Sequence, residues 1–315
     1  QISTPDTQAI SVTVTNINEA PTVDLNGTND AGINFATTFT EGDAAVSITD
    51  TDAIISDVDD TSFQHLGINL FAMPDGANEL IVVGGYTFAY GTSDVVTRTV
   101  GSTDFEIDFD GTGFSKSNEF GGNMPLADVQ TLLLGITYEN TSQSPTAGNR
   151  TLDIEIQDVG GLLSTTATST IAVSATNDAP VLSGAGLHLT AINEDTVVNN
   201  GDLVSVIIAS AGGDPITDVD AGAVEGIAIF NLSNSNGTWE YDAGSGWTAV
   251  GSVTVNSSLL LRDTDSLRFV PNTNWNGTEL VSFVAWDQTS GTAGTKVDTS
   301  AFGGTTAFSS GTAIA

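Results

Sequence analysis

One short pattern occurs twice in this chain, and it constrains the possible folds more than any other feature. An alternating stretch, Ile10–Val14, precedes Asn18-Glu19-Ala20-Pro21, and a second, Thr170–Val173, precedes Asn177-Asp178-Ala179-Pro180. Alternation with a period of two predicts a strand, and the polar link that ends in Pro predicts where the strand stops. The distance between the two copies is the length of a domain, so the pattern predicts tandem domains.

Acidic residues follow both copies of the pattern in the same order. A pair of acids comes first, a doubled aspartate around a valine comes next, and a final aspartate follows a late apolar strand. The candidate ligands are Asn18, Glu19, Glu41, Asp43, Asp57, Asp59, Asp60 and Asp158 in the first copy, and Asn177, Asp178, Glu194, Asp195, Asp218, Asp220 and Asp287 in the second.

The composition favours strands and turns. The chain has 34 Gly among its 315 residues, and long runs of the helix-forming Ala, Leu, Glu and Lys are nearly absent. Many short apolar stretches separated by Gly, Asn and Asp are typical of β-sandwiches. We therefore predict an all-β fold with two sandwich domains.

The predicted division of the chain is residues 1–20 as a terminal strand of a preceding repeat with its linker, 21–176 as the first domain, and 177–315 as the second. An insertion at about 74–150 enlarges the first domain. We predict strands in the insertion at Leu80–Val83, Tyr86–Tyr90, Val95–Val100 and Phe105–Phe109. Leu126–Leu134 has the spacing of one short helix, and Leu203–Ala209 is predicted as a strand of the second domain.

A simple seven-strand order brings these acids together. In such a sandwich the start of the first strand and two of the later loops lie at one pole, beside the link that enters the domain. Several carboxylates gathered there repel one another unless a cation is bound. Ca²⁺ accepts six to eight oxygen ligands in flexible geometry, so we predict about one to three ions at each pole. The alternative is that these acids are ordinary solvated turn residues.

The charge of the chain limits its partners. With 39 acidic and 6 basic residues the formal net charge is -33, which disfavours nucleic acid and anionic membrane surfaces. The sequence has no Cys, so disulfides and thiolate chemistry are excluded and a metal becomes the expected stabiliser. We also find no apolar run of the roughly 20 residues that a membrane-spanning helix needs.

This order of motifs resembles the bacterial cadherin-like tandem repeats of giant surface adhesins, including those of the RTX-secreted class. The resemblance covers nearly the whole chain. It implies two Ig/cadherin-like β-sandwich domains in tandem, the first enlarged by an insertion with one short helix. It also implies a Ca²⁺-stiffened extender outside the bacterial cell, a monomer whose partners are the neighbouring repeats of its own chain.

Other functions fit the sequence less well. It contains neither a Gly-x-Ser-x-Gly nor a His-Glu-x-x-His motif, and the paired carboxylates recur where a structural role explains them, so we expect no enzymatic activity. The rival hypothesis is a module that binds a host or cell-surface protein or glycan. It would use the insertion or the predicted hairpin at Trp239, where Trp239 and Tyr241 share one strand face. Core packing is the alternative role for these aromatic residues.

Overall fold

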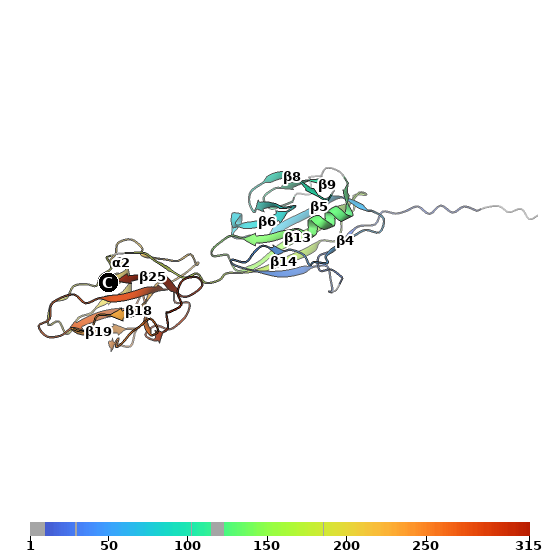
Figure 1. Ribbon diagram of the computed structural model, residues 1–315. Helices are drawn as coiled ribbons and strands as arrows, with labels where there is room; N and C mark the ends of the chain where they lie inside the picture. The colour runs from blue at the N-terminus through green and yellow to red at the C-terminus, as the bar shows by residue number, and fades with distance from the viewer. Residues whose placement is uncertain (1–9, 29, 102, 115–122, 185) are drawn as a thin grey trace, which may run out of the picture. The chain divides into compact units, whose positions relative to one another are not determined.

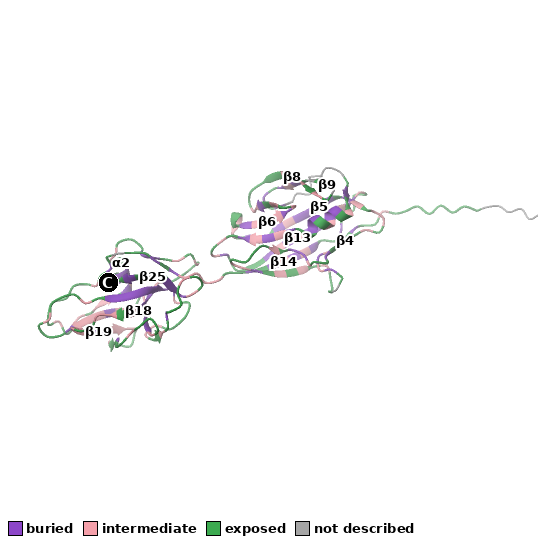
Figure 2. Cartoon of the chain, viewed as in Figure 1, coloured by how far each residue is buried: buried purple, intermediate pink, exposed green. Residues whose placement is uncertain are grey.

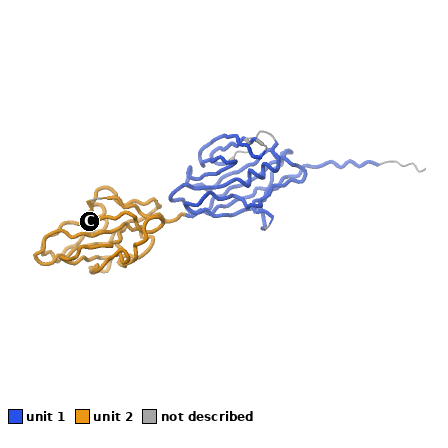
Figure 3. The backbone as a smooth tube through the Cα atoms, viewed as in Figure 1, with its two compact units in different colours: residues 1–174 blue, residues 175–315 orange. Residues whose placement is uncertain are grey.

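The computed structural model describes residues 10–28, 30–101, 103–114, 123–184 and 186–315. The fold is all-β apart from short helices, as the composition predicts. The chain divides into two compact units, unit 1 (Gln1–Ser174) and unit 2 (Ala175–Ala315), shown in Figures 1 and 3. The predicted domain boundary lies two residues further along, after residue 176.

Unit 1 is built from short and medium-length strands around one α-helix. Its elements are β1 (Thr22–Asp24), β2 (Phe35–Thr40), β3 (Val46–Ser47), β4 (Ile54–Ser56), β5 (Ser62–Phe71), the 3-10 helix η1 (Gly76–Asn78), β6 (Glu79–Val83), β7 (Tyr86–Ala89), β8 (Asp94–Val100), β9 (Thr103–Phe109), β10 (Gly113–Phe114), β11 (Met124–Pro125), α1 (Leu126–Leu134), β12 (Thr137–Asn140), β13 (Gly148–Asp158) and β14 (Ala167–Ser174). The predicted helix and the four predicted strands of the insertion are confirmed.

The largest sheet of unit 1 has the order β2-β14-β13-β5-β10-β9-β8, with β11 paired to β5. Its strands are antiparallel except for β2, which runs parallel to β14. Along β13 the side chains of Leu152, Ile154 and Ile156 are fully buried, so this strand follows the alternation of a sheet with one face on the core. A four-stranded sheet, β3-β12-β6-β7, and the pair β1-β4 complete the unit.

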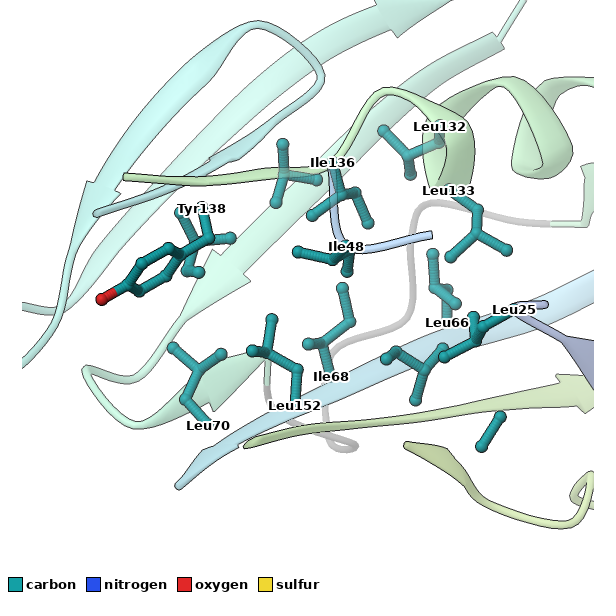
Figure 4. Packing of buried hydrophobic residues seen from close by; sticks show 14 of the residues in the cluster. Leu25, Ile48, Leu66, Ile68, Leu70, Leu132, Leu133, Ile136, Tyr138 and Leu152 are labelled. Atoms are coloured by element: carbon teal, nitrogen blue, oxygen red, sulfur yellow. The ribbon is translucent and has the colours of Figure 1, made fainter. Parts of the chain in front are cut away.

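The core of unit 1 lies between these sheets. Figure 4 shows Leu70 and Leu152 from the large sheet beside Tyr138 from β12, with Ile48 and Leu133 further along the same cluster. Val129, Leu132 and Leu133 of α1 are buried, which is the i, i+3, i+4 spacing of a helix with one apolar face.

Unit 2 has a similar variety of strands and one short helix. Its elements are β15 (Val181–Leu182), β16 (Asp202–Leu203), α2 (Val204–Ala209), β17 (Ile216–Thr217), β18 (Gly226–Leu232), β19 (Gly237–Asp242), β20 (Thr248–Ala249), β21 (Ser258–Arg262), β22 (Ser266–Pro271), β23 (Val281–Trp286), β24 (Lys296–Val297) and β25 (Phe308–Ile314). The predicted hairpin at Trp239 is confirmed as β19 and β20.

The sheets of unit 2 have the orders β24-β21-β18-β23-β25 and β16-β22-β19-β20, with β15 and β17 as a separate pair. All six residues of β23 are buried, so both of its faces are covered. Phe283 packs into the main core of the unit, whereas Trp286 packs into a smaller cluster with Phe308. Figure 2 shows this buried strand layer in purple and the connecting loops mostly in green.

Two predicted strands are wrong. Of the predicted strand Leu203–Ala209, only Leu203 lies in a strand, β16, and Val204–Ala209 forms α2, with Val204, Ile207 and Ile208 buried at helical spacing. A short apolar run does not distinguish a buried strand from a helix, and tertiary packing decided it. In the described part of the first 20 residues, the predicted strand Ile10–Val14 does not form, because no neighbouring strand pairs with it.

Candidate metal centre

Three aspartates meet at the end of unit 1 where the N-terminal segment enters. Carboxylate oxygens of Asp57, Asp60 and Asp158 all lie within 4.8 Å of one another. Asp57 and Asp60 belong to the turn after β4, and Asp158 is the last residue of β13. The register of β13 against β5 shifts between Gln157 and Asp158, and such a bulge re-aims the side chain that follows it. Asp158 is fully buried as a result.

The link before β1 is tied to these aspartates. Asn18 Nδ2 donates to Asp158 Oδ2 at 2.8 Å, and Asn16 Nδ2 donates to Asp59 Oδ2 at 3.1 Å. The backbone N–H of Glu19 donates to the carboxylate of Asp59. The repeated Asn-acid pair therefore fixes the link onto the pole through side-chain and backbone hydrogen bonds. The Glu19 carboxylate does not belong to the group of close carboxylates, which consists of three aspartates.

Hydrogen bonding leaves part of this acidic group without a partner. The backbone N–H groups of Asp59 and Asp60 both donate to Asp57 Oδ1 at 3.0 Å. Burial raises the pKa of Asp57, but these N–H donors outweigh it and the pKa is lowered. Within the described chain, the buried oxygens Asp57 Oδ2, Asp59 Oδ1 and Asp60 Oδ2 accept no hydrogen bond. Buried oxygens in this state are costly unless another ligand satisfies them.

The charges of the group also favour a bound cation. The pKa of Asp60 is raised, first by burial and then by the negative charges of Asp59, Asp57 and Asp158. The donors are all oxygen atoms, and the chain offers no thiolate. Such a set suits Ca²⁺ better than Zn²⁺, which prefers imidazole and thiolate ligands.

Unit 2 repeats the hydrogen bonds of the link and the turn, although among the described residues only Asp57, Asp60 and Asp158 of unit 1 form a group of three carboxylates within 4.8 Å of one another. Asn177 Nδ2 donates to Asp287 Oδ2 at 2.9 Å, the backbone N–H of Asp178 donates to Asp220 Oδ2 at 2.8 Å, and that of Asp220 donates to Asp218 Oδ1 at 2.9 Å. Among the described residues, the buried oxygens Asp178 Oδ2 and Asp218 Oδ2 have no hydrogen-bond partner. The pKa of Asp218 is raised by burial and then by the charges of Asp220, Asp287 and Asp178. Ala221 stands where unit 1 has Asp60.

The prediction that Glu41 and Asp43 join the pole of unit 1 is wrong. The backbone N–H of Glu41 donates to Ser174 O at 2.9 Å, and Asp43 Oδ2 accepts from the Thr40 N–H at 3.0 Å. Since β2 runs parallel to β14, its end lies beside the end of β14. The 11 residues of β13 separate this end from Asp158, a length of roughly 30 Å.

Glu194 and Asp195 are likewise away from the predicted pole of unit 2. Asp195 Oδ1 accepts from the backbone N–H of Asn274 at 2.7 Å, and Glu194 lines a pocket that Ala315 also lines. Ala315 pairs with Val281 at the start of β23, whereas Asp287 follows the end of that strand. The first pair of acids in each unit therefore lies at the opposite end of that unit from its last aspartate, which is Asp158 in unit 1 and Asp287 in unit 2.

The hairpin at Trp239 does not offer the exposed stacking face considered for sugar binding. Trp239 is 4% exposed, and its Nε1 donates to Ser233 O at 2.7 Å. Its ring packs against Phe269 with a centroid distance of 5.1 Å. Core packing is therefore the role of Trp239.

Comparisons with known proteins add little to this geometry. No protein-family model matches the chain, and no curated protein matches it. Among solved structures, a chain described under "Chaperone-tip adhesin complex is vital for synergistic activation of CFA/I fimbriae biogenesis" aligns with 10% identity and a TM-score of 0.30. The alignment covers 86% of this chain and 98% of that one. In the described residues, no helix is both long and apolar enough to cross a membrane.

Proposed function

We propose that this chain is a calcium-binding structural segment of a bacterial cell-surface adhesin and works outside the cell. In this proposal its units are two Ig/cadherin-like β-sandwiches in tandem that extend the adhesin and catalyse no reaction. Their partners are the neighbouring repeats of the same chain, and the segment is a monomer. One observation carries the proposal: buried carboxylate oxygens without a hydrogen-bond partner recur where the link meets each unit.

The residues that would hold Ca²⁺ follow from this observation. In unit 1 they are Asp57, Asp59, Asp60 and Asp158, and in unit 2 they are Asp178 and Asp218, with Asp220 and Asp287 beside them. The bound ion would offset the repulsion among these carboxylates and satisfy their unpartnered oxygens. Asn18 and Asn177 would keep the link in place, because each already donates to the last aspartate of its set. Calcium would thereby stiffen the chain at each link.

A calcium titration of the purified chain tests the proposal. Bound ions are counted by calorimetry, and thermal melting and small-angle X-ray scattering are compared in CaCl₂ and in EGTA. At a free calcium concentration 100 times the dissociation constant, each occupied site adds about 2.7 kcal/mol to the free energy of unfolding. We expect a higher melting temperature and a narrower range of shapes with calcium. Equal stability and equal scattering in both buffers would rule the calcium mechanism out.

A variant in the acidic group of unit 1 and a matched control show whether the calcium response comes from this group. Asp57→Asn removes one charge from the acidic group and should reduce the number of bound ions. Asp94→Asn makes the same chemical change at an exposed position of β8 in the same unit and should leave the calcium response unchanged. A response that both variants lose, or that both keep, would show that calcium acts elsewhere.

A further inference from the structure

A second site lies in unit 2, away from Asp218, Asp220 and Asp287. A pocket of about 610 Å³ opens between the long loop before β16 and the end of β22. This volume is in the range of small-molecule sites. The aromatic residues Trp275 and Phe269 line it beside the buried Trp239. The ring centroid of Phe269 lies 5.8 Å from that of Trp275 and 5.1 Å from that of Trp239.

Hydrogen bonds hold both walls of the pocket. Asn199 Nδ2 donates to Phe269 O at 3.0 Å, and Arg268 Nη1 donates back to Asn199 O at 2.7 Å. Further along the loop, Asp195 Oδ1 accepts from the Asn274 N–H at 2.7 Å. Asp195 and Asn274 have φ values of 67° and 56°, a left-handed conformation that few residues other than glycine adopt. The two loops are therefore locked against each other before any ligand arrives.

The polar side chains of the pocket that remain available to a ligand are mainly amides. Asn193, Asn200 and Asn276 are exposed side chains that make no hydrogen bond within the described chain. Amides both donate and accept hydrogen bonds, as sugar hydroxyl groups do. The half-buried ring of Trp275 supplies an apolar surface on which the C–H face of a sugar ring can pack.

The charges of the pocket exclude an acidic ligand. Glu194, Asp202 and Glu279 line it, against the single guanidinium of Arg268. That guanidinium is already paired with Glu240, with Nη2 2.6 Å from Oε2. A carboxylated or sulfated sugar would meet net repulsion. A basic peptide would find few free carboxylates, since Asp202 accepts from Thr190 at 2.6 Å and Glu279 accepts from Asn236 at 2.8 Å.

We propose that this pocket binds a neutral saccharide, with Trp275 as the stacking residue and Asn193, Asn200 and Asn276 as hydrogen-bonding residues. The site does not depend on the calcium function, because it uses none of the residues assigned to the metal. The chain would then carry a glycan receptor as well as a structural role.

The full chain is tested on an array of neutral, acidic and amino-sugar glycans, beside an array of basic peptides. Neutral hits are followed by saturation-transfer NMR, with methyl α-glucoside, α-mannoside and β-galactoside as defined probes. Affinity is measured from the saturation-transfer signal as a function of sugar concentration, a signal that does not depend on Trp275. We expect binding to neutral sugars only. Binding confined to acidic glycans or to peptides, or no neutral sugar bound at millimolar concentration, would overturn the proposal.

Variants locate the binding site. Trp275→Ala should weaken binding about tenfold or more. Asn200→Ala should weaken it several-fold without affecting the fold, since the Asn200 side chain has no hydrogen bond to lose within the described chain. Phe302→Ala removes an aromatic side chain that is 57% exposed and outside the pocket lining, and it should bind like the parent. Near-UV circular dichroism checks each fold. Unchanged affinity in both pocket variants would refute the assignment.

Discussion

Replacing Arg150 by methionine should remove about 3–5 kcal/mol from the free energy of unfolding of unit 1. Arg150 is 1% exposed, and its Nη2 lies 2.7 Å from Asp75 Oδ2 while its Nε lies 3.1 Å from Glu79 Oε2. The hydroxyl of Tyr138 also donates to Glu79 at 2.8 Å. The variant leaves two buried carboxylates without their cation, which is why the loss is expected to be large.

The pH dependence of the loss is a second part of this prediction. Burial raises the pKa of Asp75, but hydrogen bonds from Thr146 and Asn140 and the charge of Arg150 outweigh it, so the pKa is lowered. In the parent chain this stabilisation is complete above the unfolded pKa of about 3.9 and is lost as the pH falls through the lowered folded value. In Arg150→Met the folded pKa of Asp75 rises because the charge of Arg150 is lost, while the hydrogen bonds from Thr146 and Asn140 remain. The difference in stability between the two proteins should therefore shrink as the pH is lowered below about 4.

Urea denaturation measures the loss of stability in unit 1, and unit 2 serves as the internal control. All four tryptophans, Trp239, Trp247, Trp275 and Trp286, lie in unit 2, so tryptophan fluorescence follows that unit alone. Far-UV circular dichroism and tyrosine fluorescence follow unit 1 as well. Arg98→Met is the matched control: Arg98 stacks over Tyr86 at 4.7 Å on the surface, and we expect its loss to cost less than about 1 kcal/mol. The reasoning fails if Arg150→Met costs no more than this control, or if the tryptophan transition shifts equally.

Three further predictions concern unit 1. Leu133→Ala should cost about 2–5 kcal/mol in urea denaturation, whereas Leu134→Ala, at a position 37% exposed, should cost far less; equal losses would contradict the packing of α1. Gly27→Ala should lower the melting temperature more than Gly32→Ala, because both have positive φ but only at Gly27 would a Cβ overlap a neighbouring carboxylate. Asp60→Asn should raise the melting temperature in EGTA and lower it in CaCl₂; the same sign in both buffers would contradict the calcium site.

Features that depend on local chemistry could be predicted from the sequence. The helix at Leu126–Leu134 follows from its spacing, and the turn at Asp57–Asp60 follows from aspartates that accept the N–H groups of their own turn. The link residues Asn18 and Asn177 were identified because their motif repeats, and each is found hydrogen-bonded to the last aspartate of its copy. The repetition of the motif distinguished these residues from the many other Asn and Asp residues of this acidic chain.

Features that depend on distant pairing were predicted poorly. The assignment of Glu41 to the metal pole assumed that its strand starts at that pole. The parallel pairing of β2 with β14 instead places Glu41 beside the end of β14, at the other end of the unit. The pocket beside Trp275 had no signal in the sequence, because the loop before β16 and the end of β22 are brought together only by the fold. The sequence drew attention to Trp239, which is part of the core.

The sequence by itself determined the all-β character of the chain, its repeated links and the acidic turns that accompany them. These follow from residue periodicity and from hydrogen bonds within a few residues, which the chain carries wherever it is placed. Only the tertiary structure decided which acids share a pole, that Val204–Ala209 is a helix, and which aromatic side chain remains accessible. Strand direction and burial arise from contacts between segments far apart in the chain, and no local pattern specifies those contacts.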